Sequence, residues 1–161
     1  MVERIPMSVT GSKLLREELE RLERVERHEI IKAIETARAH GDLSENAEYH
    51  AAKERQGMVE GRILSLKDKL SRAEIIDCST VRTDRVVFGT IITLFDVLTE
   101  TEVTYQILGP EEVDVKKGTI SFLSPLGKAL LGKEEDDEVV VKTPGGLREY
   151  EVISITVSST P

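Results

Sequence analysis

Three carboxylates are spaced three residues apart between His40 and His50, at Asp42, Glu45 and Glu48. If the chain is already helical there, residues at this spacing share one face of the helix. Carboxylate oxygens grouped in this way can bind a hard divalent cation such as Mg²⁺. The spacing therefore predicts a metal-binding turn that would be the working end of the protein.

The same residues also fit a purely structural role. Gly41 can end a preceding helix in the left-handed conformation, and Asp42 can cap a following helix, with Glu45 completing a capping box. Asp42 and Glu45 alone would hold Mg²⁺ weakly, because this ion usually takes one or two carboxylates together with water and substrate phosphate. They become useful when a partner supplies the other ligands, as in a two-metal site for phosphodiester cleavage. The spacing leaves both interpretations open.

Basic residues flank the acidic turn. Arg38, Lys53 and Arg55 lie within three helical turns of it. They could form a cationic strip that contacts phosphate, although charges on an exposed coiled-coil face most often serve only solvation.

Other catalytic motifs are not found. His28, His40 and His50 do not have the spacing of a helical zinc motif. The sequence also contains no nucleophile elbow, P-loop or dinucleotide-binding glycine pattern. We therefore expect neither zinc nor an enzyme of these classes.

Both flanks of the turn have helical periodicity. From about Ser12 to Ala39, steps of three and four with one stutter connect Leu15, Leu19, Leu22, Glu26, Ile30, Ala33 and Ala37. After the turn, a stricter heptad pattern connects Tyr49, Ala52, Gln56, Val59, Ile63, Leu66, Leu70 and Ala73. Two such stripes separated by a short turn predict an antiparallel helical hairpin. Its arms would be about 40 Å long at 1.5 Å per residue.

Two glycines interrupt the second helical pattern. Gly57 and Gly61 lie inside it, where glycine is less favourable than alanine by about 1 kcal/mol. A close approach between the helices would account for them.

The pattern changes after Ala73. Enrichment in Val, Ile, Thr and Phe predicts strands at residues 75–80, 85–95, 102–108 and 119–123. Ser124 and Pro125 can start a short helix that Gly132 ends, and residues 138–157 have the pattern of a β-hairpin. We predict a two-domain α+β protein: a helical hairpin over residues 1–77 with its tip at about 40–46, and a domain over residues 78–161 with a mostly antiparallel sheet.

Composition limits the functional classes. The formal net charge of −8 argues against non-specific binding to nucleic acid or anionic membranes. Residues 12–73 hold 13 Lys or Arg and 13 Asp or Glu, whereas residues 74–161 hold 8 and 16. The single cysteine, Cys78, fits a structural role in a reducing compartment. No apolar run is long enough to span a bilayer, so we expect a cytoplasmic protein with no membrane partner.

Several motifs in the same order resemble the Gre family of bacterial transcript cleavage factors, nearest the GreA type. The first is the tip itself, His40-Gly41-Asp42-Leu43-Ser44-Glu45-Asn46-Ala47-Glu48-Tyr49-His50-Ala51-Ala52. The others are Ile5-Pro6-Met7, Glu60-Gly61-Arg62-Ile63, Ser124-Pro125, Gly132-Lys133-Glu134-Glu135-Asp136-Asp137 and Lys142-Thr143-Pro144-Gly145-Gly146. The likeness extends over nearly the whole chain.

This resemblance implies a transcription elongation factor that is not itself an enzyme. Its hairpin would enter the secondary channel of RNA polymerase, and an FKBP-like C-terminal domain would dock at the channel's rim. Asp42 and Glu45 match the tip acids that help hold a second Mg²⁺, shared with the polymerase, and orient the attacking water. The polymerase itself would then cut backtracked RNA and rescue the arrested complex. Glu48 would be a supporting charge, and the free protein a monomer.

The resemblance also assigns a role to the basic residues. Arg38, Lys53 and Arg55 match a basic patch that faces the 3′ segment of the nascent RNA. Lys53 stands where arginine is frequent, so a bidentate contact to phosphate is lost although the charge is kept.

Two other functions stay open. An anti-Gre-type inhibitor would occlude the same channel without cleavage, and such inhibitors tend toward a denser acidic tip than this one. A binding or chaperone module built on the C-terminal half would instead be active from residues 84–161 alone.

Overall fold

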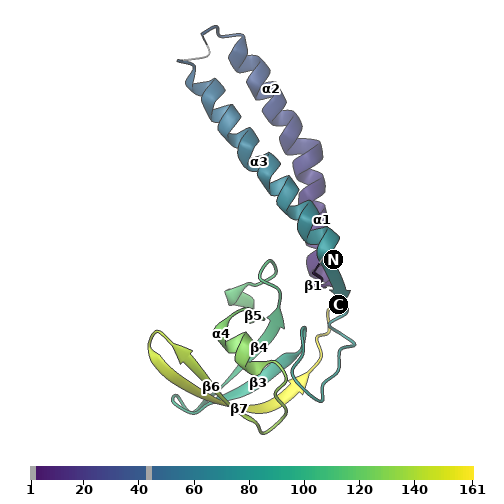
Figure 1. The fold of residues 1–161 in the computed structure, drawn as a ribbon, viewed down its shortest axis with the longest axis vertical. Coiled ribbons are helices and arrows are strands. Elements are labelled where there is room, and N and C mark those ends of the chain that lie inside the picture. The colour runs from purple at the N-terminus through teal and green to yellow at the C-terminus, as the bar shows by residue number, and fades with distance from the viewer. Residues whose placement is uncertain (1–2, 43–44) are drawn as a thin grey trace. The chain divides into compact units, whose positions relative to one another are not determined.

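The computed structural model describes residues 3–42 and 45–161. The chain divides into two compact units. The first contains residues 12–73, which form the helical hairpin, and the second combines residues 4–11 with residues 74–161. The predicted α+β architecture is confirmed, with helices in the first unit and a mostly antiparallel sheet in the second (Figure 1).

The first arm of the hairpin is helical throughout but not uniform. It consists of α1 (Val9–Arg21), a π-helical turn (Leu22–Glu26) and α2 (Arg27–Arg38). A π-turn inserts an extra residue into a helix, and it lies where the apolar stripe has its stutter. The stutter in the sequence is therefore taken up by a local change of helix type, which keeps one face of the arm directed at its partner.

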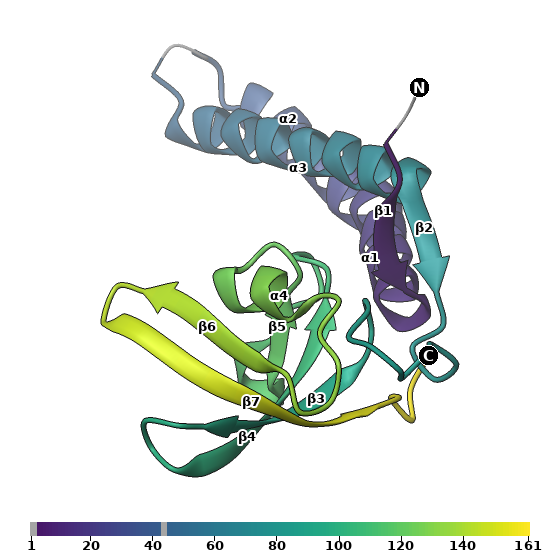
Figure 2. The ribbon, with the colours of Figure 1, turned by 60° about the horizontal axis from the view of Figure 1, so that its bottom comes forward.

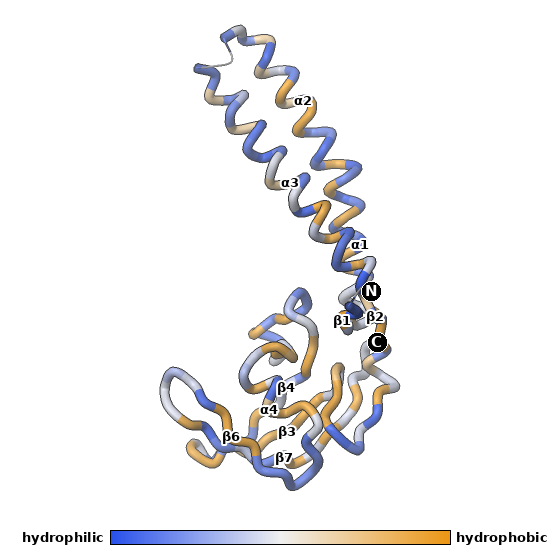
Figure 3. Tube along the Cα trace, viewed as in Figure 1, coloured by the Kyte–Doolittle hydropathy of each residue, from blue (hydrophilic) through white to orange (hydrophobic). Residues whose placement is uncertain are grey.

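The second arm is α3 (Ala47–Arg72), and its heptad pattern is confirmed because every predicted stripe position is buried or half-buried. The prediction of buried positions in the first arm is wrong at one residue. Ala33 is exposed, and Ile34 is buried instead with 8% of its surface exposed. After the π-turn the buried face follows Ile30, Ile34 and Ala37, where Ile30 and Ala37 are as predicted and Ile34 packs with Ala52 of α3. Figure 3 shows hydrophobic positions recurring along both arms.

Among the ion pairs that connect the two arms, two are forked. Arg62 Nε and Nη2 donate to the Glu18 carboxylate at 2.9 and 3.0 Å. Arg27 makes the same forked contact with Glu60, at 2.7 and 2.8 Å. These hydrogen bonds lower the pKa of Glu18 and the pKa of Glu60 below their ordinary value of 4.5.

This arrangement predicts that the hairpin loses stability in acid. A carboxyl group with a lowered folded-state pKa stabilises the fold above its unfolded pKa, and this stabilisation is lost as the pH falls through the folded value. The midpoint temperature of thermal unfolding, followed by helical circular dichroism, should therefore be constant near neutral pH. It should decrease once the pH is lower than about 4.5. A Glu18→Gln, Glu60→Gln variant should show a shallower fall, and an identical pH profile would contradict the role of these pairs.

The expectation of a close helix approach at Gly57 and Gly61 is wrong. Both residues are exposed, and a Cβ atom added at either position would meet nothing within 4 Å. The two glycines therefore lower helix stability without any packing benefit inside this unit.

Replacing either glycine with alanine should stabilise the hairpin. Gly57→Ala and Gly61→Ala should each raise the free energy of unfolding by about 0.5–1 kcal/mol, because alanine loses less backbone entropy in a helix. Urea unfolding followed by circular dichroism measures this change. A loss of stability in either variant would show that the site has a steric constraint.

The second unit contains a five-stranded sheet in the order β5-β4-β3-β7-β6. Its strands are β3 (Ile91–Asp96), β4 (Thr101–Leu108), β5 (Thr119–Ser121), β6 (Glu138–Thr143) and β7 (Gly146–Thr156). All neighbouring pairs are antiparallel except β4 and β5, which are parallel. The predicted strand at residues 85–95 begins only at Ile91, because Gly89 interrupts it with a φ of +90° and approaches Cys78 too closely for a side chain.

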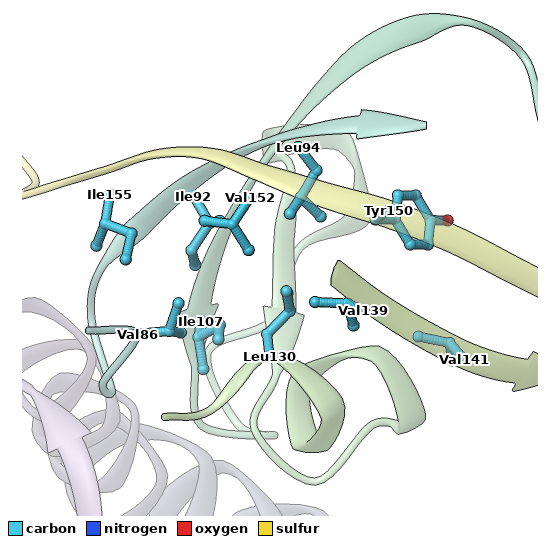
Figure 4. Close-up of a cluster of buried hydrophobic side chains, with 10 residues drawn as sticks. All are labelled: Val86, Ile92, Leu94, Ile107, Leu130, Val139, Val141, Tyr150, Val152 and Ile155. Atoms are coloured by element: carbon cyan, nitrogen blue, oxygen red, sulfur yellow. The ribbon is translucent and has the colours of Figure 1, made fainter. Parts of the chain in front are cut away.

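One helix covers a face of this sheet. It is α4 (Pro125–Leu130), and its start is confirmed because the Ser124 hydroxyl accepts from the Gly127 amide at 3.1 Å. The core lies between α4 and the sheet (Figure 4). Its buried members are Val86, Ile92, Leu94, Ile107, Leu130, Val139, Val141, Tyr150, Val152 and Ile155.

Residues 4–11 belong to the second unit although the hairpin follows them in the sequence. The strand β1 (Ile5–Ser8), which the sequence did not indicate, pairs with β2 (Ala73–Ile76) in a two-stranded sheet (Figure 2). The Glu112 carboxylate accepts from the Ser8 amide at 3.2 Å and from the Ser8 hydroxyl. A side chain at Gly11 would clash with the same carboxylate. These contacts explain why residues 4–11 group with residues 74–161.

Cys78 is buried in this unit, in agreement with the predicted structural role. It packs with Phe88 and Leu108, and burial raises the pKa of its thiol to about 11. No helix among the described residues is long and apolar enough to cross a membrane.

Candidate functional site

The first arm ends just before the acidic turn. The amide of His40 donates to the Ala37 carbonyl at 3.1 Å, and the amide of Gly41 donates to the Arg38 carbonyl at 3.2 Å. Gly41 has a φ of +102°, which confirms that it ends the helix in the left-handed region. The chain therefore leaves α2 after Arg38, and Gly41 leads into Asp42.

The three acids do not share a helical face. Asp42 and Glu45 lie outside the helices, and α3 begins only at Ala47. Glu48 is the single acid of the three on a helix, in its first turn. Asp42 and Glu45 are both exposed at the turn, whereas Leu43 and Ser44 lie outside the described residues. Two exposed carboxylates are thus presented from non-helical backbone rather than from a helical surface.

Asn46, and not Asp42, caps the second arm. Its side-chain Oδ1 accepts from the Tyr49 amide at 3.0 Å. The predicted capping box with Asp42 and Glu45 is therefore wrong. Asparagine is among the preferred N-cap residues, so a signal for this cap was present in the sequence, four residues beyond the position chosen.

Asn46 also contacts the other arm. Its Nδ2 donates to the Ala37 carbonyl at 2.6 Å, so one side chain connects the end of α2 to the start of α3. Periodicity gave no indication of this contact, because a hydrogen bond between segments depends on their separation in space.

Aromatic and histidine side chains surround the start of α3. Tyr49 packs against the buried cluster that contains Ile30, Ile34 and Ala52. The ring of His50 meets that of Tyr49 edge to face, with centroids 5.6 Å apart. His40 Nε2 lies 3.6 Å from Glu48 Oε2, and both side chains are well exposed. Glu48 therefore lies close to an imidazole ring, in the first turn of α3.

The three basic residues have different surroundings. Arg38 is exposed in the last turn of α2, and Lys53 Nζ donates to Gln56 Oε1 at 2.9 Å on the exposed surface of α3. Arg55 Nη2 instead lies 2.6 Å from Glu26 Oε2 and 3.6 Å from a Glu29 oxygen. The guanidinium of Arg55 is thus already engaged by carboxylates of the first arm.

A groove of about 470 Å³ lies between the arms below the turn. It is lined by Ile30, Ala33, Thr36, Glu48, Ala51, Ala52 and Arg55. Four of these side chains are alanine or threonine, so small side chains line most of the groove.

The donor set of the turn suits a hard cation but is incomplete. Asp42 and Glu45 each offer a carboxylate, the ligand type that Mg²⁺ prefers. Within residues 3–42 and 45–161, no group of three His, Cys, Asp or Glu side chains could hold a metal ion. Asp42 and Glu45 could therefore supply only part of the coordination sphere of such an ion.

Two family models match consecutive parts of the chain. One, described as the N-terminal part of a transcription elongation factor and named GreA_GreB_N, matches residues 5–75. The other, described as the C-terminal part of GreA/GreB, matches residues 81–157. Together they cover both structural units.

Similar proteins carry the same description. The chain is 67% identical to transcription elongation factor GreA of Desulfotalea psychrophila, over 96% of each chain. It is 54% identical to the GreA protein of Syntrophotalea carbinolica, over 96% of this chain and 98% of that one. Among solved structures, GreA factor homolog 1 of Thermus thermophilus is 32% identical with a TM-score of 0.44, over 95% of this chain and 99% of that one.

Proposed function

Because the chain belongs to the GreA/GreB family of transcription elongation factors, we propose that it activates RNA cleavage within bacterial RNA polymerase. The helical hairpin enters the secondary channel of the polymerase, and the C-terminal unit docks at the rim of that channel. The polymerase then cuts the backtracked nascent RNA, which restores a 3′ end in the active centre. The observation that supports this proposal is the pair of exposed carboxylates, Asp42 and Glu45, at the end of a slender hairpin.

Asp42 and Glu45 act in this proposal as ligands brought by the factor. They would hold a Mg²⁺ ion shared with the polymerase, which when bound supplies charge stabilisation for in-line attack by water on the phosphodiester. The chain itself contributes negative charge at the point where the partner's ligands are incomplete. It has no cleavage activity alone, because its own donor set cannot complete the coordination sphere.

Arg38 and Lys53 contact the phosphates of the displaced RNA 3′ segment in this proposal. Both are exposed near the turn, and cationic side chains position nucleic acid through its backbone. Arg55 contributes less, because contact with RNA would have to replace its ion pairs with Glu26 and Glu29.

A cleavage assay tests the proposal. Backtracked elongation complexes with labelled RNA are incubated with Mg²⁺ and the full-length protein, with polymerase alone and protein alone as controls. We expect shortened RNA and renewed elongation only when polymerase and protein are both present. Blocked elongation without shortened RNA would overturn the proposal and assign the protein as a channel inhibitor.

A further inference from the structure

We propose that Asn46 is a positioning residue that fixes the placement of the two tip acids. The inference rests on the proposed function, since it concerns how Asp42 and Glu45 are held for metal binding. It depends on the two different hydrogen bonds made by the Asn46 side chain.

The first bond is an ordinary helix cap. Oδ1 of Asn46 accepts from the Tyr49 amide at 3.0 Å, which satisfies one of the unpaired amides at the start of α3. Aspartate and serine can make the same bond about as well. The cap by itself therefore does not require an amide side chain at this position.

The second bond requires the amide group. Nδ2 of Asn46 donates to the Ala37 carbonyl at 2.6 Å, and neither an ionised aspartate nor the shorter serine could replace this donor. The same carbonyl accepts from the His40 amide, in the last turn of the first arm. Ala37 is itself almost fully buried, with 1% of its surface exposed. The bond thus ties the start of α3 to a fixed point on the end of α2.

Along the chain, Asp42 and Glu45 lie between the two residues that this hydrogen bond connects, Ala37 and Asn46. Glu45 is bonded directly to Asn46, so the placement of its backbone follows that of the tied residue. On the other side, Gly41 is held by its amide to the Arg38 carbonyl and leads directly into Asp42. If the tie is removed, the packing of the arms still sets the separation of the helix ends, but the backbone at Asn46 is no longer held against Ala37. The distance and angle between the two carboxylates would then vary.

The test uses variants that keep the cap and remove the tie. Asn46→Ser retains a capping oxygen without adding charge, and Asn46→Asp retains the cap with nearly the same shape. Asn46→Ala removes both bonds and serves as the reference for a lost cap. Circular dichroism and protection of the Tyr49 amide from hydrogen exchange should show an intact start of α3 in the Ser and Asp variants, and loss of protection in the Ala variant.

Cleavage is then measured against factor concentration with backtracked polymerase complexes. We expect the maximal cleavage rate to fall at least about tenfold in both capped variants, because a misplacement of about 1 Å can cost on the order of 100-fold. The concentration for half-maximal cleavage should stay within about twofold of the unmodified protein. A purely structural role would instead leave the maximal rate of both capped variants unchanged.

The remaining outcomes are also decisive. Near-normal cleavage by either capped variant would overturn the inference. A lower cleavage rate would also overturn it if weaker binding to polymerase accounts for the whole decrease, or if the Tyr49 amide loses its protection in the same variant. Asp42→Asn, assayed in parallel, separates the two proposals. If that variant is inactive and the capped variants are active, only the positioning role fails, whereas full activity of Asp42→Asn would remove the proposed function itself.

Discussion

Replacing Asp42 with asparagine should reduce stimulated RNA cleavage by about 100-fold or more while leaving the affinity for polymerase nearly unchanged. The amide is almost the same size as the carboxylate but carries no charge, so it is a much weaker ligand for Mg²⁺. Loss of one group that stabilises developing charge typically costs a factor of about 10²–10³ in rate. Asp42 is exposed and lies outside both helices, so the substitution should not alter the fold. The measurement is the rate of shortening of labelled RNA in backtracked complexes.

Glu48→Gln is the matched control, because it removes one carboxylate from the same turn. Glu48 is in the first turn of α3 and near His40, and we expect its replacement to change cleavage by no more than a few-fold. Competition between each variant and the unmodified protein for polymerase reports affinity separately. Full cleavage by Asp42→Asn, or equal losses in both variants, would refute the assigned metal ligand.

Replacing Leu130 with alanine should destabilise the second unit by about 2–5 kcal/mol, the range for deletion of a fully buried leucine side chain. Leu130 has 0% of its surface exposed and extends from α4 into the core of the sheet (Figure 4). Its loss would leave a cavity in the core between α4 and the sheet. Urea unfolding followed by amide hydrogen exchange of β3 measures this unit apart from the hairpin.

The neighbouring Leu131 provides the control. It has the same side chain but is 38% exposed, at the end of α4. Leu131→Ala should change the free energy of unfolding much less than Leu130→Ala. Equal losses in the two variants would contradict the placement of α4 on the sheet.

The hairpin was predictable because its signals are local. Heptad spacing in the second arm identified the buried positions from Tyr49 to Ala73, and each is buried or half-buried. Gly41 ended the first arm as expected, because few residues other than glycine adopt a positive φ easily. Ser124 and Pro125 likewise marked the start of α4. In each case the deciding interaction lies within a few residues along the chain.

Features that depend on distant segments were missed. The strand β1 forms only because β2 lies beside it in space. The burial of Ile34 in place of Ala33 depends on which face of α2 meets Ala52 of α3. The pairing of Arg55 with Glu26 depends on how the two arms face each other.

The acidic turn also has some features that the local sequence predicts and others that depend on distant segments. By itself the sequence determined which residues can donate oxygen to a cation, and that they lie between two helices, because residue type and periodicity carry that information. Only the tertiary structure decided that Asp42 and Glu45 stand outside the helices and that Asn46 joins the two arms. A hydrogen bond from Asn46 to Ala37 depends on the separation of two helix ends, and that separation is set by the packing of the whole hairpin.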